Sequence, residues 1–213
     1  MEYILDPFRL IPLIILAVVF WYIRKKKKEA QGPAPAKKGS PGAPRPAGER
    51  PVKPADPPEV VYAGLRKRAF EVSPQSLGSA GDVREDEAYG VIMEMGISDS
   101  VLTLACFADG DAGLYYQSGG GMKGGGAHEN IRRAAKAFVA LAQPALAQMS
   151  PSDSQPLPEA GMVCFHALTP KGVLSAEVDR ESLGESESPF KALFYSGQEV
   201  VGQMRQVQAQ KAS

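Results

Sequence analysis

The pattern of apolar and polar positions divides the chain into three parts. Residues 10–23 are almost wholly apolar, residues 29–58 are dominated by Pro, Ala, Gly and Lys, and the rest mixes apolar and polar positions in regular patterns. A segment of the second kind has too little apolar surface to build a core. The pattern predicts an apolar helix at residues 1–23, a linker at 24–58, a folded domain at 59–208 and a frayed tail at 209–213.

Five segments of the folded domain have the pattern of β-strands. They are rich in apolar and β-branched residues or alternate apolar with polar positions. The turn sequences Asp109-Gly110 and Thr169 to Gly172 separate two pairs of them, so two antiparallel hairpins are expected. The segments are residues 89–95, 101–107, 113–117, 162–168 and 173–178, and Tyr89, Val91, Met93 and Met95 are expected to share one face of the first.

Three segments have helical patterns. The prolines at 57 and 58 are expected to open a short helix that ends before Pro74. Apolar positions recur at spacings of three and four from Ala127 to Met149, where Pro144 should kink or interrupt the helix. A last helix is expected over residues 189–208. The order of elements predicts an α+β domain in which helices cover one face of a five-stranded, mainly antiparallel sheet.

Charge is distributed unevenly, although the formal net charge is zero. Residues 24–54 hold ten basic and two acidic side chains, whereas residues 55–213 hold 13 basic and 20 acidic ones. Nucleic acid is an unlikely partner of the domain, because basic side chains supply most of the affinity for phosphate backbones. The basic segment suits the headgroups of an anionic membrane leaflet.

The amino-terminal segment is long enough to span a bilayer. A helix over residues 4–23 would be about 30 Å long, which matches the hydrocarbon core. Trp21 and Tyr22 lie where interfacial aromatic residues belong, and a basic run at 24–28 follows directly. A signal peptide has the opposite charge order. We therefore expect an uncleaved single-pass anchor in the plasma or inner membrane, with the amino terminus outside and the domain in the cytoplasm.

The most unusual stretch of the domain is SGGGMKGGGAHE, residues 118–129, which we call the glycine joint. Such a density of glycine indicates positive φ angles, close approach of the backbone, or mobility. Backbone amides at a helix start can also bind an anion. The joint is thus either a structural connection or a ligand or partner site, and the candidate ligand-binding residues are Gly119, Gly120, Gly121, Lys123, Gly124, Gly125, Gly126 and His128.

Few residues offer catalytic or metal chemistry. The P-loop pattern is absent, and no Cys/His cluster has the spacing of a zinc site, so no cofactor or metal is expected. A base at His128 acting on Ser118 would lack a companion group, and His166 is expected to be a satisfied core or edge histidine. Cys106 and Cys164 lie in apolar runs and are expected to be buried free thiols.

Residues 89–138 combine a Met-Glu-x-Gly strand end, an Asp-Gly turn, a Leu-Tyr strand and the glycine joint followed by His-Glu. This segment resembles an uncharacterised bacterial domain family, a domain of unknown function. The resemblance covers about a quarter of the chain. It implies a bacterial source and no known activity, so it transfers no catalytic residue.

The sequence favours a membrane-anchored cytoplasmic domain that binds a partner protein or small ligand around the glycine joint without catalysis. An alternative function is a phosphate-binding or nucleotide-binding domain, or an enzyme, that uses the joint and the following helix start. Self-association through an open sheet edge would make the partner a second copy of the chain.

Overall fold

The computed structural model describes residues 56–81, 83–185 and 187–211. All of them belong to one compact unit, residues 53–213. The predicted membrane helix and most of the predicted linker lie outside the described residues. Within these ranges, no helix is long and apolar enough to cross a membrane.

The centre of the domain is one antiparallel sheet in the order β4-β3-β2-β1-β6-β7-β5. The five expected strands are present, and two more bring the total to seven in the described ranges, so the expected number was too low. The additional strands, β4 and β5, are two residues long and lie at the edges, too short to give a periodic signal. The strands are β1 Gly90–Ile97, β2 Ser100–Phe107, β3 Ala112–Tyr116, β4 Gly121–Met122, β5 Ser150–Pro151, β6 Met162–Thr169 and β7 Gly172–Asp179.

Strand β1 lies in the middle of the sheet and is buried along nearly all its length. Its Met93 is paired with Leu104 of β2 and with Phe165 of β6. Both predicted hairpins form, β2 with β3 and β6 with β7. Because side chains alternate along a strand, Met93 and Glu94 point to opposite faces of the sheet.

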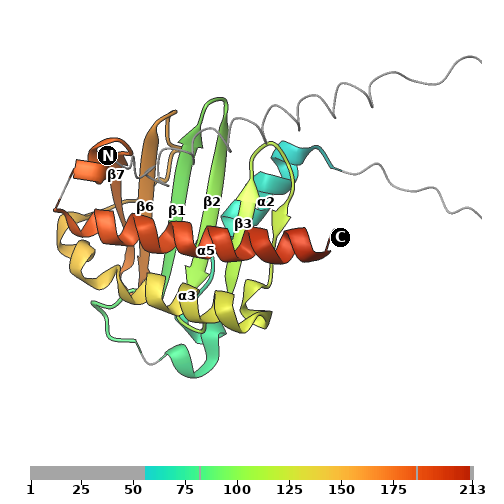
Figure 1. Cartoon of the computed structure of the whole chain (residues 1–213). Coiled ribbons are helices and arrows are strands. Elements are labelled where there is room, and N and C mark those ends of the chain that lie inside the picture. Colours follow the sequence, from blue (N-terminus) through green and yellow to red (C-terminus); the bar gives the residue numbers. More distant parts are fainter. Residues whose placement is uncertain (1–55, 82, 186, 212–213) are drawn as a thin grey trace, which may run out of the picture. The chain divides into compact units, whose positions relative to one another are not determined.

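One face is covered by α3, Glu129–Ala140, and α5, Pro189–Lys211, which cross in front of the strands in Figure 1. Their apolar stripes and the facing strands form the larger core, with Phe138 and Leu193 fully buried. The helix predicted over 127–149 ends at Ala140, and Pro144 lies in the following 3-10 turn, η4 Gln143–Gln148. A short helix, α4 Ser182–Glu185, precedes α5.

The opposite face is covered by α2, Pro58–Phe70, which passes behind β2 and β3 in Figure 1. Ala69 packs there in a second core cluster with Ile92 and Ala105. The expectation that helices cover only one face was therefore wrong. Tyr89 also belongs to this second cluster and not to the face of Val91, because it precedes the first residue of β1. The 3-10 segment η2, Pro74–Gly81, follows α2.

Candidate functional site

The first glycine triplet forms the turn between β3 and β4. Gly119 and Gly120 have φ angles of 102° and 86°, which L side chains rarely adopt. The Gly119 N–H donates to the Tyr116 carbonyl at 2.9 Å, and the Tyr116 N–H donates to the Gly120 carbonyl at 3.2 Å. On the far side of the turn, the Gln208 side chain of α5 donates to the Gly121 carbonyl at 2.9 Å. Positive φ angles therefore explain this half of the joint.

The second triplet leads into α3 through the 3-10 turn η3, Gly125–Ala127. Gly125 is buried, and a Cβ atom at this position would lie 2.9 Å from Ile131 Cγ2 and 3.0 Å from the Ala112 carbonyl oxygen. Both distances are shorter than ordinary van der Waals contact. Close approach of the backbone to β3 and α3 therefore explains the second half of the joint.

Two backbone amides at this end of the joint, those of Gly126 and His128, already have acceptors. The Gly126 N–H donates to Asp111 Oδ1 at 3.2 Å, and the His128 N–H donates to the Gly125 carbonyl at 3.0 Å. Arg132 forms an ion pair with Glu129 and donates to the Gly126 carbonyl at 3.3 Å. A carboxylate thus lies where the sequence suggested that an anion could bind.

Replacing Gly125 with alanine tests whether the joint is closely packed. The change is expected to lower the free energy of unfolding by about 1–3 kcal/mol, because the added methyl group overpacks the contact with β3 and α3. Gly124→Ala is the matched neighbour, with open space around its Cβ but a φ of 68°. We expect a cost of about 1 kcal/mol there. Urea unfolding followed by circular dichroism measures both variants, and a neutral Gly125→Ala would indicate a loosely packed joint.

The first triplet also forms one wall of a cleft beside α2. The cleft has a volume of about 230 Å³. Val61 and Leu65 face it from the helix, and Val61 is 47% exposed. The remaining lining residues come from the same end of α2, from β3 and from the joint: Asp56, Pro58, Tyr62, Tyr115, Tyr116, Gly119 and Gly120. We call this space the apolar cleft, because aliphatic and aromatic side chains form most of its wall.

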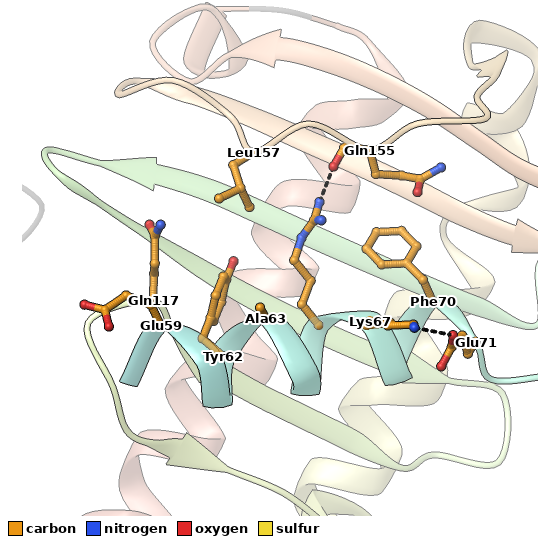
Figure 2. A pocket seen from close by; sticks show the side chains of 10 residues that line it. Glu59, Tyr62, Ala63, Lys67, Phe70, Glu71, Gln117, Gln155 and Leu157 are labelled. Carbon is orange, nitrogen blue, oxygen red and sulfur yellow. Dashed lines mark hydrogen bonds and ion pairs between the residues drawn. The ribbon is translucent and has the colours of Figure 1, made fainter. Parts of the chain in front are cut away.

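A second cleft, of about 390 Å³, lies along the neighbouring face of α2. Figure 2 shows Gln155 and Leu157 on the chain that faces α2 across this space, and Tyr62 and Phe70 on the helix itself. Tyr62 lines both clefts. The other lining residues are mostly polar or charged: Glu59, Ala63, Arg66, Lys67, Glu71 and Gln117. We call this space the polar cleft.

Beneath α2, a fully buried carboxylate on β1 is bound by a side chain of the helix. Arg66 donates from Nε and Nη2 to the two oxygens of Glu94 at 2.8 and 2.7 Å. Thr103 Oγ1 donates to the same carboxylate at 2.8 Å, and the Tyr62 hydroxyl lies 2.8 Å from Thr103 Oγ1. Arg66 Nη2 also donates to the Gln155 carbonyl at 2.6 Å. This polar network connects α2, β1 and β2.

Glu94 stays ionised in spite of its burial. Burial acts to raise the pKa of Glu94, but the hydrogen bonds and charge of Arg66, with further contributions from His166 and Thr103, hold that pKa at about 2. His166 Nε2 lies 3.4 Å from Glu94 Oε2 and has no hydrogen-bond partner among the described residues, and its Nδ1 is 2.8 Å from the Ser175 hydroxyl. The network is therefore a buried ion pair with a histidine beside it.

The lowered pKa of Glu94 makes part of the stability dependent on pH. The stabilisation is complete above the ordinary pKa of 4.5 and is lost as the pH falls towards 2. The shift corresponds to about 3 kcal/mol. Urea unfolding of the wild type and Glu94→Gln at pH 6 and pH 2.5 measures this contribution. The stability difference between the two proteins should shrink at the lower pH, and a constant difference would contradict the assignment.

The sequence located only part of this site. Gly119 and Gly120 line the apolar cleft, whereas Gly125 and Gly126 make contacts within the fold. The buried thiols expected at Cys106 and Cys164 are confirmed, as is the core position of His166. Glu94 was missed, and the one signal for it was an acidic residue inside an otherwise apolar strand.

Comparison with known proteins gives no match: no family model, curated protein or solved structure is significantly similar to the chain. The resemblance of residues 89–138 to an uncharacterised bacterial family stays a prediction. What the fold and the site define is an α+β domain with a helix on one face, two helices on the other, and two clefts along α2.

Proposed function

We propose that the domain is a non-catalytic binding module that receives aromatic or aliphatic groups of a partner protein or small ligand in the apolar cleft. The observation that carries this proposal is the lining of the cleft, which brings Val61 and Leu65 of α2 together with Tyr115 of β3. Transfer of apolar groups from water into such a space is favourable in proportion to the area that they bury.

Two of the tyrosines that line the cleft use their hydroxyls within the fold. The Tyr62 hydroxyl bonds to Thr103, and the Tyr116 hydroxyl accepts from Arg205 Nε of α5 at 3.3 Å, on the other face of the sheet. The aromatic rings of Tyr62 and Tyr115 are therefore what the cleft offers to a ligand. Aromatic rings pack well against other rings and against aliphatic groups, and they are frequent in binding surfaces.

The glycine joint contributes to this proposal through its first triplet. Gly119 and Gly120 carry no side chain, which leaves the backbone of the turn open to a bound group. The alternative, phosphate or nucleotide binding at the second triplet, would require an anion to displace Asp111 from the Gly126 amide. In the proposal the module belongs to a single-pass membrane protein and faces the cytoplasm, which the apolar amino-terminal segment and the basic run after it support.

A thermal-shift measurement tests the proposal on the fragment 53–213. Its two core clusters are built from residues between Ala69 and Val207, so the fragment contains its own core. The probes are p-cresol and indole, which mimic aromatic side chains, and inorganic phosphate and ATP. We expect p-cresol or indole to raise the melting temperature, because a ligand that binds only the folded state stabilises it.

Two neighbouring valines supply the matched control. Val60 and Val61 are 57% and 47% exposed, but only Val61 lines the apolar cleft. The shift caused by p-cresol should be lost in Val61→Asp and retained in Val60→Asp. A shift with phosphate or ATP that disappears when Gly124, Gly125 and Gly126 become alanine would support the alternative function. The absence of any aromatic response would contradict the proposed one.

A further inference from the structure

Helix α2 is attached to the sheet differently from the other long helices. It fully buries only two side chains, Tyr62 and Ala69, while the partly buried Phe70 packs against the second core cluster. Helix α3 buries four residues and α5 buries seven, all of them apolar apart from one glycine. The apolar area that opposes detachment is therefore small for α2 and large for α3 and α5.

The hydrogen bonds that attach α2 to the sheet come from charged and polar side chains. Arg66 holds Glu94 with two hydrogen bonds, and Tyr62 bonds to Thr103. When a helix leaves a sheet, both members of an ion pair regain their hydration, which offsets most of the attraction that is lost. Apolar side chains have no such compensation in water. A helix held by charges can thus detach at a lower free energy than a helix held by an equal area of apolar contact.

Helix α2 also has little stability of its own. It is 13 residues long, and no side chain caps its amino terminus. Isolated helices of this length are marginal in water. Once Arg66, Tyr62, Ala69 and Phe70 have left the sheet, no packing contact preserves the helix, so its hydrogen bonds should be lost together.

We infer that α2 is a releasable strap, which opens and closes as a unit while the sheet, α3 and α5 stay folded. Because Tyr62 and other residues of α2 line both clefts, the apolar cleft exists only while the strap is closed. This regulatory role rests on the proposed function. A bound aromatic group holds the strap closed, and release of the strap removes the site. The chain enters the folded domain through α2, so a mechanical force applied through the preceding residues acts on the strap before it acts on the rest of the domain.

Hydrogen exchange of the unliganded fragment 53–213, followed by NMR, tests the strap. The amides from Tyr62 to Phe70 should exchange at one common rate, at least a hundredfold faster than the slowest amides of α3 and α5. A rate that falls gradually from the start of α2 towards Phe70 would indicate fraying and would overturn the inference. So would exchange of α2 at the slow rate of α5, because α2 would then open only when the whole domain unfolds.

Variants of the ion pair make the test independent of the ligand. Arg66→Met should accelerate exchange in α2 at least tenfold and keep it at least a hundredfold faster than the slowest amides of α3 and α5, which accelerate with the loss of global stability. Arg66→Met with Glu94→Met, which replaces charge by apolar contact, should slow α2 again to the wild-type rate or below. Exchange of α2 at the same rate as the slowest amides of α5 in Arg66→Met would contradict a separate strap. Addition of p-cresol should slow the exchange of α2, and if p-cresol fails to bind, the proposed function falls while the unliganded rates still decide the strap.

Discussion

Methionine in place of Arg66 is expected to lower the free energy of unfolding by about 3 kcal/mol, because it leaves a buried charge without its partner. Glu94 is 0% exposed, and in the variant Thr103 would be the remaining hydrogen-bond donor at its carboxylate among those described. Far-UV circular dichroism in urea measures the loss. The domain in residues 53–213 contains no tryptophan, so intrinsic tryptophan fluorescence cannot replace it.

The double variant Arg66→Met, Glu94→Met separates the effect of an unpaired charge on stability from the effect of a change in side-chain volume. It removes both ions and fills the same space with apolar groups, so its stability should lie within about 1 kcal/mol of the wild type. Arg66→Lys keeps the charge but loses the two parallel hydrogen bonds, and we expect an intermediate loss. If the double variant lost as much as Arg66→Met alone, the unpaired carboxylate would not be the cause.

Phe138→Ala is expected to destabilise the other face of the sheet by about 3–5 kcal/mol, because it leaves a cavity in the main core. Phe138 is 0% exposed, and its ring lies close to the backbone of Gly197 on α5. Here the attachment is apolar, so the loss should appear in the cooperative unfolding of the whole domain. Urea unfolding of the variant measures this loss.

A substitution in α5 provides the control for Phe138→Ala. The Cβ of an alanine at Gly202 would meet nothing within 4 Å. Gly202→Ala should therefore raise stability by about 0.5–1 kcal/mol through helix propensity alone. If Phe138→Ala lowered the free energy of unfolding by less than about 1 kcal/mol, the result would contradict the account of this core. The neighbouring side chains would then have filled almost the whole cavity that the removed ring leaves.

The strands and helices with strong local patterns could be predicted from the sequence. Asp109-Gly110 indicated the hairpin of β2 and β3, and Pro144 indicated the interruption after α3. The two-residue strands β4 and β5 could not be predicted, because they are defined by their neighbours and not by their own periodicity. The side of the sheet covered by α2 was also hidden, since that helix has no strong apolar stripe.

The site was less predictable than the fold because its contacts are not local. Arg66 and Glu94 are 28 residues apart, and no spacing rule connects a helix residue to a particular strand residue at that separation. Gly119 and Gly120 were predicted as ligand-binding residues, and both line the apolar cleft. Val61 and Leu65 line the same cleft, but they lie in a helix more than fifty residues earlier in the sequence. The sequence left three explanations for the glycine joint: positive φ angles, close approach of the backbone, or mobility. Positive φ angles apply in the first triplet, and close approach of the backbone applies in the second.

The most direct test of the central claim is an NMR titration of the ¹⁵N-labelled fragment 53–213 with p-cresol and, separately, with inorganic phosphate. If the apolar cleft is the binding site, p-cresol shifts the amide signals of Val61, Tyr115, Gly119 and Gly120, and phosphate leaves those of residues 124–126 unchanged. Shifts at residues 124–126 with phosphate, together with none around α2 with p-cresol, would contradict the account.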